Sequence, residues 1–295
     1  KICVIEQPDI VLVVGDVNST IAAALTAKKL NIQIAHVEAG LRSGDRKMPE
    51  EINRLATDAI TDFLFTTEEE ASKNLLKEGH PQDKVYFVGH VMIDNLFYQL
   101  EKTRRGFVSQ KIKKIKKKLP LQYICMTLHR PSNVDSKEVL SELLTAIKSV
   151  TTKVPVLFPC HPRTWKQIVK YDLEGMFVTA DSIEDSMYNG IVFMEPLDFN
   201  DFLYLWKDST IVLTDSGGIQ EETSALNVPC ITIRENTERP ITVEMGTNVL
   251  VGNNIDKLNN EIEKAISKNG KKGQVPPLWD GNASIRIGDI LSKIS

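Results

Sequence analysis

Short apolar runs alternate with amphipathic stretches along the whole chain. Most of the runs lack internal polar alternation, which is typical of strands that helices cover on both faces. The stretches between them place apolar residues at helical spacing, and this rhythm predicts parallel βαβ units. The predicted strands cover residues 10–15, 33–38, 63–67, 85–89, 123–128, 154–160, 191–196, 210–215 and 229–234.

Helix signals fall between these runs. Pro49 precedes one helical pattern and Pro229 follows another, as expected for a residue that favours helix starts and cannot continue a helix. The predicted helices cover residues 19–30, residues 50–59, the stretch after Asp135 with Glu138 as its capping-box partner, and residues 219 to about 227.

A change of pattern between Val88 and Gln122 marks the expected domain boundary. Residues 89–100 predict a connecting helix. The basic run KIKKIKKK (111–118) predicts a solvated amphipathic helix, with too little apolar area for a membrane-surface role. Because the two halves share one strand-helix rhythm, we expect two Rossmann-like, doubly wound domains that face a cleft. Ligands of such folds bind at the carboxyl ends of the strands.

Composition narrows the function classes. The chain has 295 residues, 42% of them hydrophobic, and a net charge of −3, which gives no reason to expect nucleic acid or a membrane as partner. Its cysteines stand far apart and form no CxxC pair, so buried reduced thiols are expected and a metal site is not. The opening residues lack a secretory signal pattern, so we expect a cytoplasmic protein.

The strongest chemical signal is TDSGGIQEE (214–222), where an apolar strand ends and a helix opens. Gly217 and Gly218 let a ligand approach the backbone, and the free N–H groups of the first helical turn suit phosphate oxygens. Ser216 adds a hydroxyl donor. A carboxylate beside a pyrophosphate is repelled, so Glu222 is expected to point elsewhere, toward ribose hydroxyls. An ordinary glycine-rich turn remains the alternative.

Acidic residues end strands in the first half. Asp16 and Glu38 follow consecutive strands of one predicted sheet, so their side chains are expected to converge, whereas Glu50 opens a helix. Converging carboxylates raise one another's pKa and can divide acid and base roles. Each has a structural alternative: a turn residue, a surface charge and a helix-start charge.

Basic residues end strands in the second half. His129 and Arg130 lie in LHRPSN, and His161 and Arg163 lie in PCHPRT one strand later. Two such pairs on one sheet predict an electropositive rim for an anionic substrate. Arg234 opens RENTERP (234–240) after another strand; it either meets phosphate or pairs with a neighbouring glutamate.

Taken in order, these segments closely resemble the non-hydrolysing UDP-N-acetylglucosamine 2-epimerases. The resemblance covers nearly the whole chain, and its most specific segments are HVEAGLRSGD, PEEINR and DSGGIQEE. It implies a GT-B architecture with domains at 1–91 and 92–278 and a last helix within 279–295 that packs back on the first domain. The segments are GDVNST (15–20), HVEAGLRSGD (36–45), PEEINR (49–54), HRPSN (129–133), HPRT (161–164), EPL (195–197), DSGGIQEE (215–222) and RENTERP (234–240).

The resemblance also implies a reaction. Members interconvert UDP-N-acetylglucosamine and UDP-N-acetylmannosamine: a base removes the C2 proton, UDP leaves C1 to give a glycal, and UDP adds back with a proton on the other face. Neither NAD nor a metal is required. The family is typically a homodimer that feeds polysaccharide biosynthesis, and some members bind a second substrate molecule as activator.

The family's functional residues fall on the residues already singled out. The family's acid/base carboxylates correspond to Asp16, Glu38 and Glu50. The histidine that assists UDP departure corresponds to His129, and the active-site arginine corresponds to Arg54. The pyrophosphate binders correspond to Ser216, Gly217 and Gly218, and the ribose binder corresponds to Glu222. His161 and Arg130 are candidates for the activator site.

The chain departs from the family pattern at three places, one of which is Ile241, where the family often has Glu after ERP. Ser132 stands where the family commonly has Glu, which puts the sugar in doubt, for example a modified or oxidised UDP-HexNAc. The family opens with a strand and a GTRPE-type turn, and no segment here matches them. We therefore expect the chain as given to be inactive alone or poorly soluble.

Three other functions remain open from the sequence. A GT-B glycosyltransferase would share the nucleotide-binding helix but would not exchange the C2 proton with solvent. A hydrolysing epimerase would release UDP stoichiometrically. A binding-only remnant would bind UDP without turnover.

Overall fold

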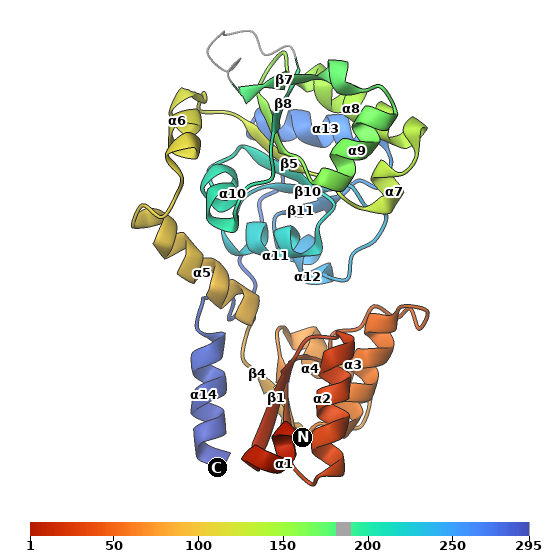
Figure 1. Cartoon of the computed structure of the whole chain (residues 1–295), viewed down its shortest axis with the longest axis vertical. Coiled ribbons are helices and arrows are strands. Elements are labelled where there is room, and N and C mark those ends of the chain that lie inside the picture. The colour runs from red at the N-terminus through yellow and green to blue at the C-terminus, as the bar shows by residue number, and fades with distance from the viewer. Residues whose placement is uncertain (181–189, 295) are drawn as a thin grey trace. The chain divides into compact units, whose positions relative to one another are not determined.

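The structure is a computed structural model that describes residues 1–180 and 190–294. It contains two compact units, one formed by Lys1–Asn95 with Pro277–Ser295 and the other by Leu96–Pro276 (Figure 1). The chain therefore leaves the first unit, builds the whole of the second, and returns to complete the first.

The first unit has a four-stranded parallel sheet in the order β1-β2-β3-β4. Its strands are β1 (Ile10–Val14), β2 (Gln33–Ala39), β3 (Phe63–Thr66) and β4 (Val85–Phe87). Its helices are α1 (Ile2–Glu6), α2 (Asn18–Lys29), α3 (Pro49–Ile60), α4 (Glu69–Lys77), the 3-10 turn η1 (Gln82–Lys84) and α14 (Ala283–Ile294).

The returning segment joins the core of this unit. Ile287 of α14 packs into a buried apolar cluster with residues of β2 and β3, among them Val37 and Phe65. The Asp94 carboxylate accepts hydrogen bonds from the first two N–H groups of α14, at 3.0 and 2.6 Å, which satisfies donors that a helix start leaves unpaired. Trp279 is buried, and its indole N–H donates to the carbonyl of Thr67.

The second unit has a seven-stranded parallel sheet in the order β11-β10-β9-β5-β6-β8-β7. Its strands are β5 (Ile124–Thr127), β6 (Val156–Pro159), β7 (Phe177–Thr179), β8 (Ile191–Met194), β9 (Ile211–Thr214), β10 (Cys230–Thr232) and β11 (Asn248–Leu250). Its helices are α6 (Gln110–Lys118), α7 (Pro131–Val134), α8 (Lys137–Val150), α9 (Pro162–Lys170), η2 (Glu174–Met176), α10 (Phe199–Trp206), α11 (Gly217–Ala225), α12 (Pro240–Glu244) and α13 (Ile255–Ile266), while α5 (Val91–Arg104) runs across the division between the units.

These elements confirm the predicted α/β class with two Rossmann-like parallel sheets. Every predicted strand is present, most of them one to three residues shorter than expected. Two short strands, β7 and β11, were not predicted. Nor were the helices α1, α4, α7, α9, α10, α12 and α13. The predicted cap of α8 was wrong: Ser136, not Asp135, caps the helix by accepting from the N–H of Val139. The Asp135 carboxylate instead binds Arg163, at 2.7 Å.

Candidate active site

Arg54 joins the ends of two neighbouring strands in the first unit. Asp16 follows β1 and Glu38 lies near the end of β2, and β1 pairs with β2 in parallel. The buried Arg54 guanidinium reaches the Asp16 carboxylate at 2.5 Å and the carbonyl oxygen of Glu38. The structure thus brings together three predicted site residues that are far apart in the sequence.

Glu38 adopts an unusual backbone conformation. Its φ is 69°, and the pairing of β2 with β3 is irregular between Val37 and Ala39, so Glu38 sits at a bulge. A non-glycine residue in this region costs about 1–3 kcal/mol and persists only where its surroundings hold it, as Arg54 does here. The Glu38 carboxylate is mostly buried beside Gly15, where an added Cβ would lie 3.7 Å from its Oε2 atom. The bulge therefore turns this carboxylate toward the Asp16 loop.

The acidic start of α3 divides into an exposed and a buried residue. Glu50 is exposed in the first turn, one helical turn before Arg54 and on the same face. Glu51 is buried and accepts hydrogen bonds from Ser43 and from the N–H of Gly44. The sequence pointed to Glu50, but Glu51 is the one that orders the loop before the helix.

Asn53 is a further residue of this site that the sequence reasoning missed. Its side-chain amide donates to the carbonyl of Asp16 and to Asn18, both at 2.9 Å. The signal was present, because Asn53 lies inside the PEEINR segment next to Arg54. Helix α3 therefore holds the Asp16 loop at two points: Arg54 binds the Asp16 side chain, and Asn53 binds the Asp16 backbone carbonyl.

Asp215 organises the corresponding edge of the second unit. It is fully buried after β9 and accepts from the backbone N–H groups of His129 and Arg130 and from the Asn133 amide, at 3.0, 2.8 and 3.1 Å. The His129 ring Nδ1 lies 3.1 Å from Asp215. Burial alone would raise the pKa of Asp215, but hydrogen bonds from His129 and Arg130 lower it overall. Asp215 and Asn133 were not predicted as site residues.

The glycine-rich turn opens α11 as predicted. Ser216 is the N-cap residue, and Gly217 and Gly218 form the first turn of the helix. A Cβ built on either glycine would meet nothing within 4 Å, so the space before the helix start is open. This leaves the N–H groups of the first turn accessible to an anion.

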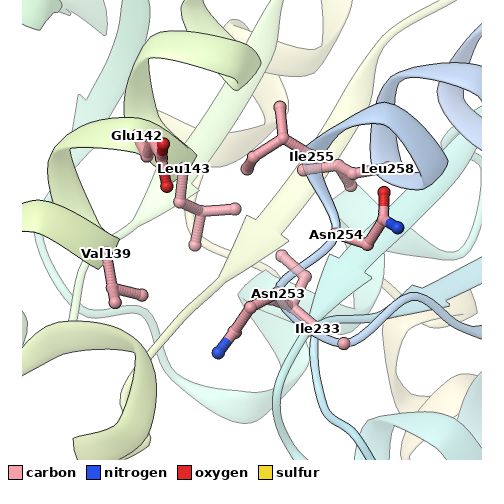
Figure 2. A pocket seen from close by; sticks show the side chains of 9 residues that line it. Val139, Glu142, Leu143, Ile233, Asn253, Asn254, Ile255 and Leu258 are labelled. Atoms are coloured by element: carbon pink, nitrogen blue, oxygen red, sulfur yellow. The ribbon is translucent and has the colours of Figure 1, made fainter.

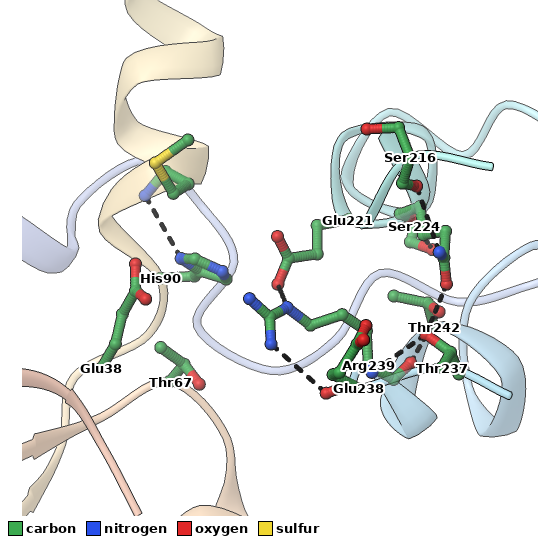
Figure 3. A network of polar contacts seen from close by, with 12 residues as sticks. Glu38, Thr67, His90, Ser216, Glu221, Ser224, Thr237, Glu238, Arg239 and Thr242 are labelled. Atoms are coloured by element: carbon green, nitrogen blue, oxygen red, sulfur yellow. Dashed lines mark hydrogen bonds and ion pairs between the residues drawn. The ribbon is translucent and has the colours of Figure 1, made fainter. Parts of the chain in front are cut away.

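Glu222 lies one turn further along α11 and is held in an unusual state. The residue is 7% exposed, and its Oε2 atom is buried without a hydrogen-bond partner among the described residues. Burial, with the neighbouring charge of Glu221, raises the pKa of Glu222 to about 8. Glu221 itself pairs with Arg239 (Figure 3). Glu222 therefore keeps a buried carboxyl oxygen without a partner among the described residues, in the helix that the glycine-rich turn opens.

The remaining predicted residues follow neighbouring strands. The loops that carry Arg234, Ser216, His129 and His161 come after β10, β9, β5 and β6, which are consecutive in the sheet. The rings of His129 and His161 are 6.4 Å apart between centroids. Arg234 pairs with Glu238 at 2.7 Å, which was one of its two expected roles. This edge thus gathers the predicted basic residues.

A small hollow elsewhere in the second unit is excluded as a substrate site. It lies between α8, α13 and the loop after β11, and holds about 30 Å³ (Figure 2). That is room for a water molecule, not for a nucleotide sugar. Its lining residues are Val139, Glu142, Leu143, Ile233, Gly252, Asn253, Asn254, Ile255 and Leu258.

Residues 1–180 and 190–294 lack two further kinds of feature. In this part of the chain, no group of three or more His, Cys, Asp or Glu side chains is arranged to hold a metal ion. Nor does any helix there have the length and apolarity needed to cross a membrane.

Comparisons with known proteins agree on one family. A family model described as UDP-N-acetylglucosamine 2-epimerase matches residues 1–292. The UDP-N-acetylglucosamine 2-epimerase of Methanococcus maripaludis is 42% identical over 294 residues, which cover 99% of this chain and 77% of that protein. The UDP-2,3-diacetamido-2,3-dideoxy-D-glucuronate 2-epimerase of Pseudomonas aeruginosa is 38% identical, with 98% and 76% covered. The crystal structure of Methanocaldococcus jannaschii UDP-GlcNAc 2-epimerase with UDP-GlcNAc and UDP has a TM-score of 0.78 at 40% identity, with 99% and 78% covered.

Proposed function

The chain belongs to the UDP-N-acetylglucosamine 2-epimerase family, and we propose that it interconverts UDP-N-acetylglucosamine and UDP-N-acetylmannosamine without a cofactor. The observation that carries the proposal is the pair of strand-end residues Asp16 and Glu38, which Arg54 links by binding the Asp16 carboxylate and the backbone carbonyl oxygen of Glu38. A transferase that moves a sugar to an acceptor has less need of two such groups.

The carboxylates act on the proton at C2. One of them removes this proton, the C–H electron pair forms the C1–C2 double bond of a glycal, and the C1–O bond breaks so that its electrons leave on the β-phosphate of UDP. Return of UDP to C1, with a proton delivered to the other face of C2, gives the epimer. We assign these proton transfers to Asp16 and Glu38, and Glu50 either assists there or organises the site.

The second unit holds the departing UDP. The open helix start at Ser216, Gly217 and Gly218 supports binding of the pyrophosphate, because its free N–H groups and the helix dipole favour negative charge. His129 assists the departure of UDP, and its contact with Asp215 supports this role by fixing the ring. Arg130, His161 and Arg234 supply the surrounding positive charge.

Glu222 binds the ribose. Its buried acceptor without a partner supports this assignment, because two ribose hydroxyls can donate to one carboxylate. Binding would draw the carboxyl group into its ionised form. A sugar whose leaving group contains no ribose could not make this contact with Glu222.

The assembly and setting of the enzyme rest on the family alone. We propose a cytoplasmic homodimer whose product serves polysaccharide biosynthesis.

A modified sugar is the second candidate substrate. Ser132 stands where the family commonly has Glu, and its hydroxyl lies 3.4 Å from the Asn133 side chain. The relative from Pseudomonas aeruginosa is named for a 2,3-diacetamido glucuronate sugar, which is an oxidised and doubly acetamidated UDP-HexNAc. Removal of one carboxylate would ease the binding of a substrate that carries its own.

One experiment tests both candidates. NMR would follow UDP-N-acetylglucosamine in deuterated water with the protein carrying the N-terminal segment from its genomic locus, and the expected result is growth of the UDP-N-acetylmannosamine signals with deuterium at C2. Transfer without exchange at C2 would instead indicate a glycosyltransferase, and stoichiometric free UDP a hydrolysing epimerase. Exchange with only the diacetamido glucuronate sugar would identify the second candidate.

A further inference from the structure

A buried histidine and aspartate lie beneath the two candidate proton-transfer carboxylates. His36 on β2 and Asp58 on α3 are both fully buried. The ring Nδ1 of His36 lies 2.6 Å from the Asp58 carboxylate. The proposed function uses neither residue, and burying an ion pair is often no more favourable than burying an apolar pair of the same size. The pair therefore calls for a purpose other than stability.

The pair reaches one peptide on each side of the site. The His36 Nε2 atom bonds the carbonyl oxygen of Gly15 at 2.9 Å, which belongs to the peptide that leads into Asp16. Asp58 accepts from the N–H of Gly40 at 3.1 Å, two residues after Glu38. One side-chain pair thus fixes the backbone on which both carboxylates stand.

The neighbours of His36 and Asp58 indicate which atoms of the pair donate hydrogen bonds and which accept them. The Gly15 carbonyl can only accept, so Nε2 of His36 carries a hydrogen. The Asp58 carboxylate also accepts from the N–H of Gly40, and it pairs with the Arg42 guanidinium at 2.8 Å. Burial would raise the pKa of Asp58, but the hydrogen bond from His36 and the charges of His36 and Arg42 lower it overall. Asp58 is thus surrounded by contacts from His36, Gly40 and Arg42 that favour its carboxylate form.

We infer that His36 and Asp58 are positioning residues for the proton-transfer step, acting through the peptides at Gly15 and Gly40. The inference rests on the proposed function, since it assigns the pair to the same reaction. Displacing a reacting group by about 1 Å can cost about 100-fold in rate. The backbone at Gly40 is closely packed, because an added Cβ there would lie 2.3 Å from the carbonyl oxygen of Ala71.

The test separates the two arms of His36. Gln can place an N–H near the position of Nε2 and keep the bond to Gly15, whereas Asn places its N–H near Nδ1 and keeps only the bond to Asp58. We expect His36→Gln to retain kcat within about threefold and His36→Asn to lose about 10- to 100-fold. Asp58→Asn should lose a similar factor in kcat, with the UDP dissociation constant unchanged because UDP contacts lie on the other unit.

Asp62→Asn is the matched control. Asp62 accepts from the N–H of Ile34 at 3.0 Å and so pins the opposite, amino end of β2. It should lower the thermal stability of the first unit while kcat stays within about twofold. If all four variants lose kcat in proportion to their loss of stability, or if His36→Asn and Asp58→Asn keep kcat, the positioning role is wrong. Absence of C2 exchange in the unaltered protein would instead overturn the proposed function.

Discussion

Replacing Glu222 with Gln should make the second unit more stable at alkaline pH. Folding raises the pKa of Glu222 from 4.5 to about 8 through burial and the charge of Glu221. Between these values the folded protein keeps a proton that the unfolded chain has already lost. The stability linked to this group is therefore fully present below about pH 4.5 and is lost as the pH rises through 8.

The size of the effect follows from that interval. Each pH unit costs about 1.4 kcal/mol of unfolding free energy while only the folded state holds the proton, so the whole interval costs about 5 kcal/mol. Gln carries no proton to lose. The two proteins should therefore have similar stability near pH 5, and Glu222→Gln should become the more stable one by several kcal/mol at pH 9.

Urea unfolding from pH 5 to pH 9 measures this difference. The chain has two compact units, so two transitions are expected, and only the one that belongs to Leu96–Pro276 should shift. Glu142→Gln is the control, because this exposed glutamate on α8 carries no such burial. Curves for the unaltered protein and Glu222→Gln that stay parallel over the whole range would refute the reasoning.

Four further results are expected. Binding of UDP at pH 7 should release close to one proton from the unaltered protein and none from Glu222→Gln. Calorimetry in buffers of different ionisation enthalpy measures this release, and equal release from both proteins would remove Glu222 from the ribose site. Arg54→Lys should lower kcat by about 100-fold although the charge is kept, because one ammonium group cannot replace the planar guanidinium that reaches both strand ends. Unchanged steady-state kinetics would contradict this. Gly218→Val should fold normally but bind UDP at least about tenfold more weakly in a titration, because its side chain would fill the open space at the helix start. Gly40→Ala should destabilise the first unit by about 2 kcal/mol or more in urea unfolding, because its Cβ would lie 2.3 Å from the carbonyl oxygen of Ala71 at a φ of 78°; an unchanged midpoint would mean that α4 moves freely.

The strand pattern was predictable because buried parallel strands are continuous apolar runs. Strands β7 and β11 were missed because each lies in a short apolar run, and β11 begins with a polar Asn248. Helix α1 was missed for a different reason: Ile2, Val4 and Ile5 are exposed, so no amphipathic face marks it as a packed helix.

Site residues could be predicted where a polar side chain lies at the end of a predicted strand, as at Asp16, Glu38 and His129. The sequence alone does not tell which of two adjacent carboxylates turns inward, because this depends on where the helix begins. Glu51 rather than Glu50 is therefore buried. The left-handed conformation of Glu38 was also beyond prediction, because propensity reserves that region for Gly and Asn. Asp215 shows a third limit, since its role appears only once β5 and β9 are known to be neighbours.

The discontinuous course of the chain has a consequence for biosynthesis. A chain emerging from a ribosome normally folds its amino-terminal domain first. Here the first unit is finished only by Pro277–Ser295, whose Trp279 and Ile287 belong to its buried interior. The second unit can therefore fold before helix α14 of the first unit has been translated. The order of folding in the cell should run opposite to the order of synthesis, and the early strands will need protection from aggregation until Pro277–Ser295 has been made.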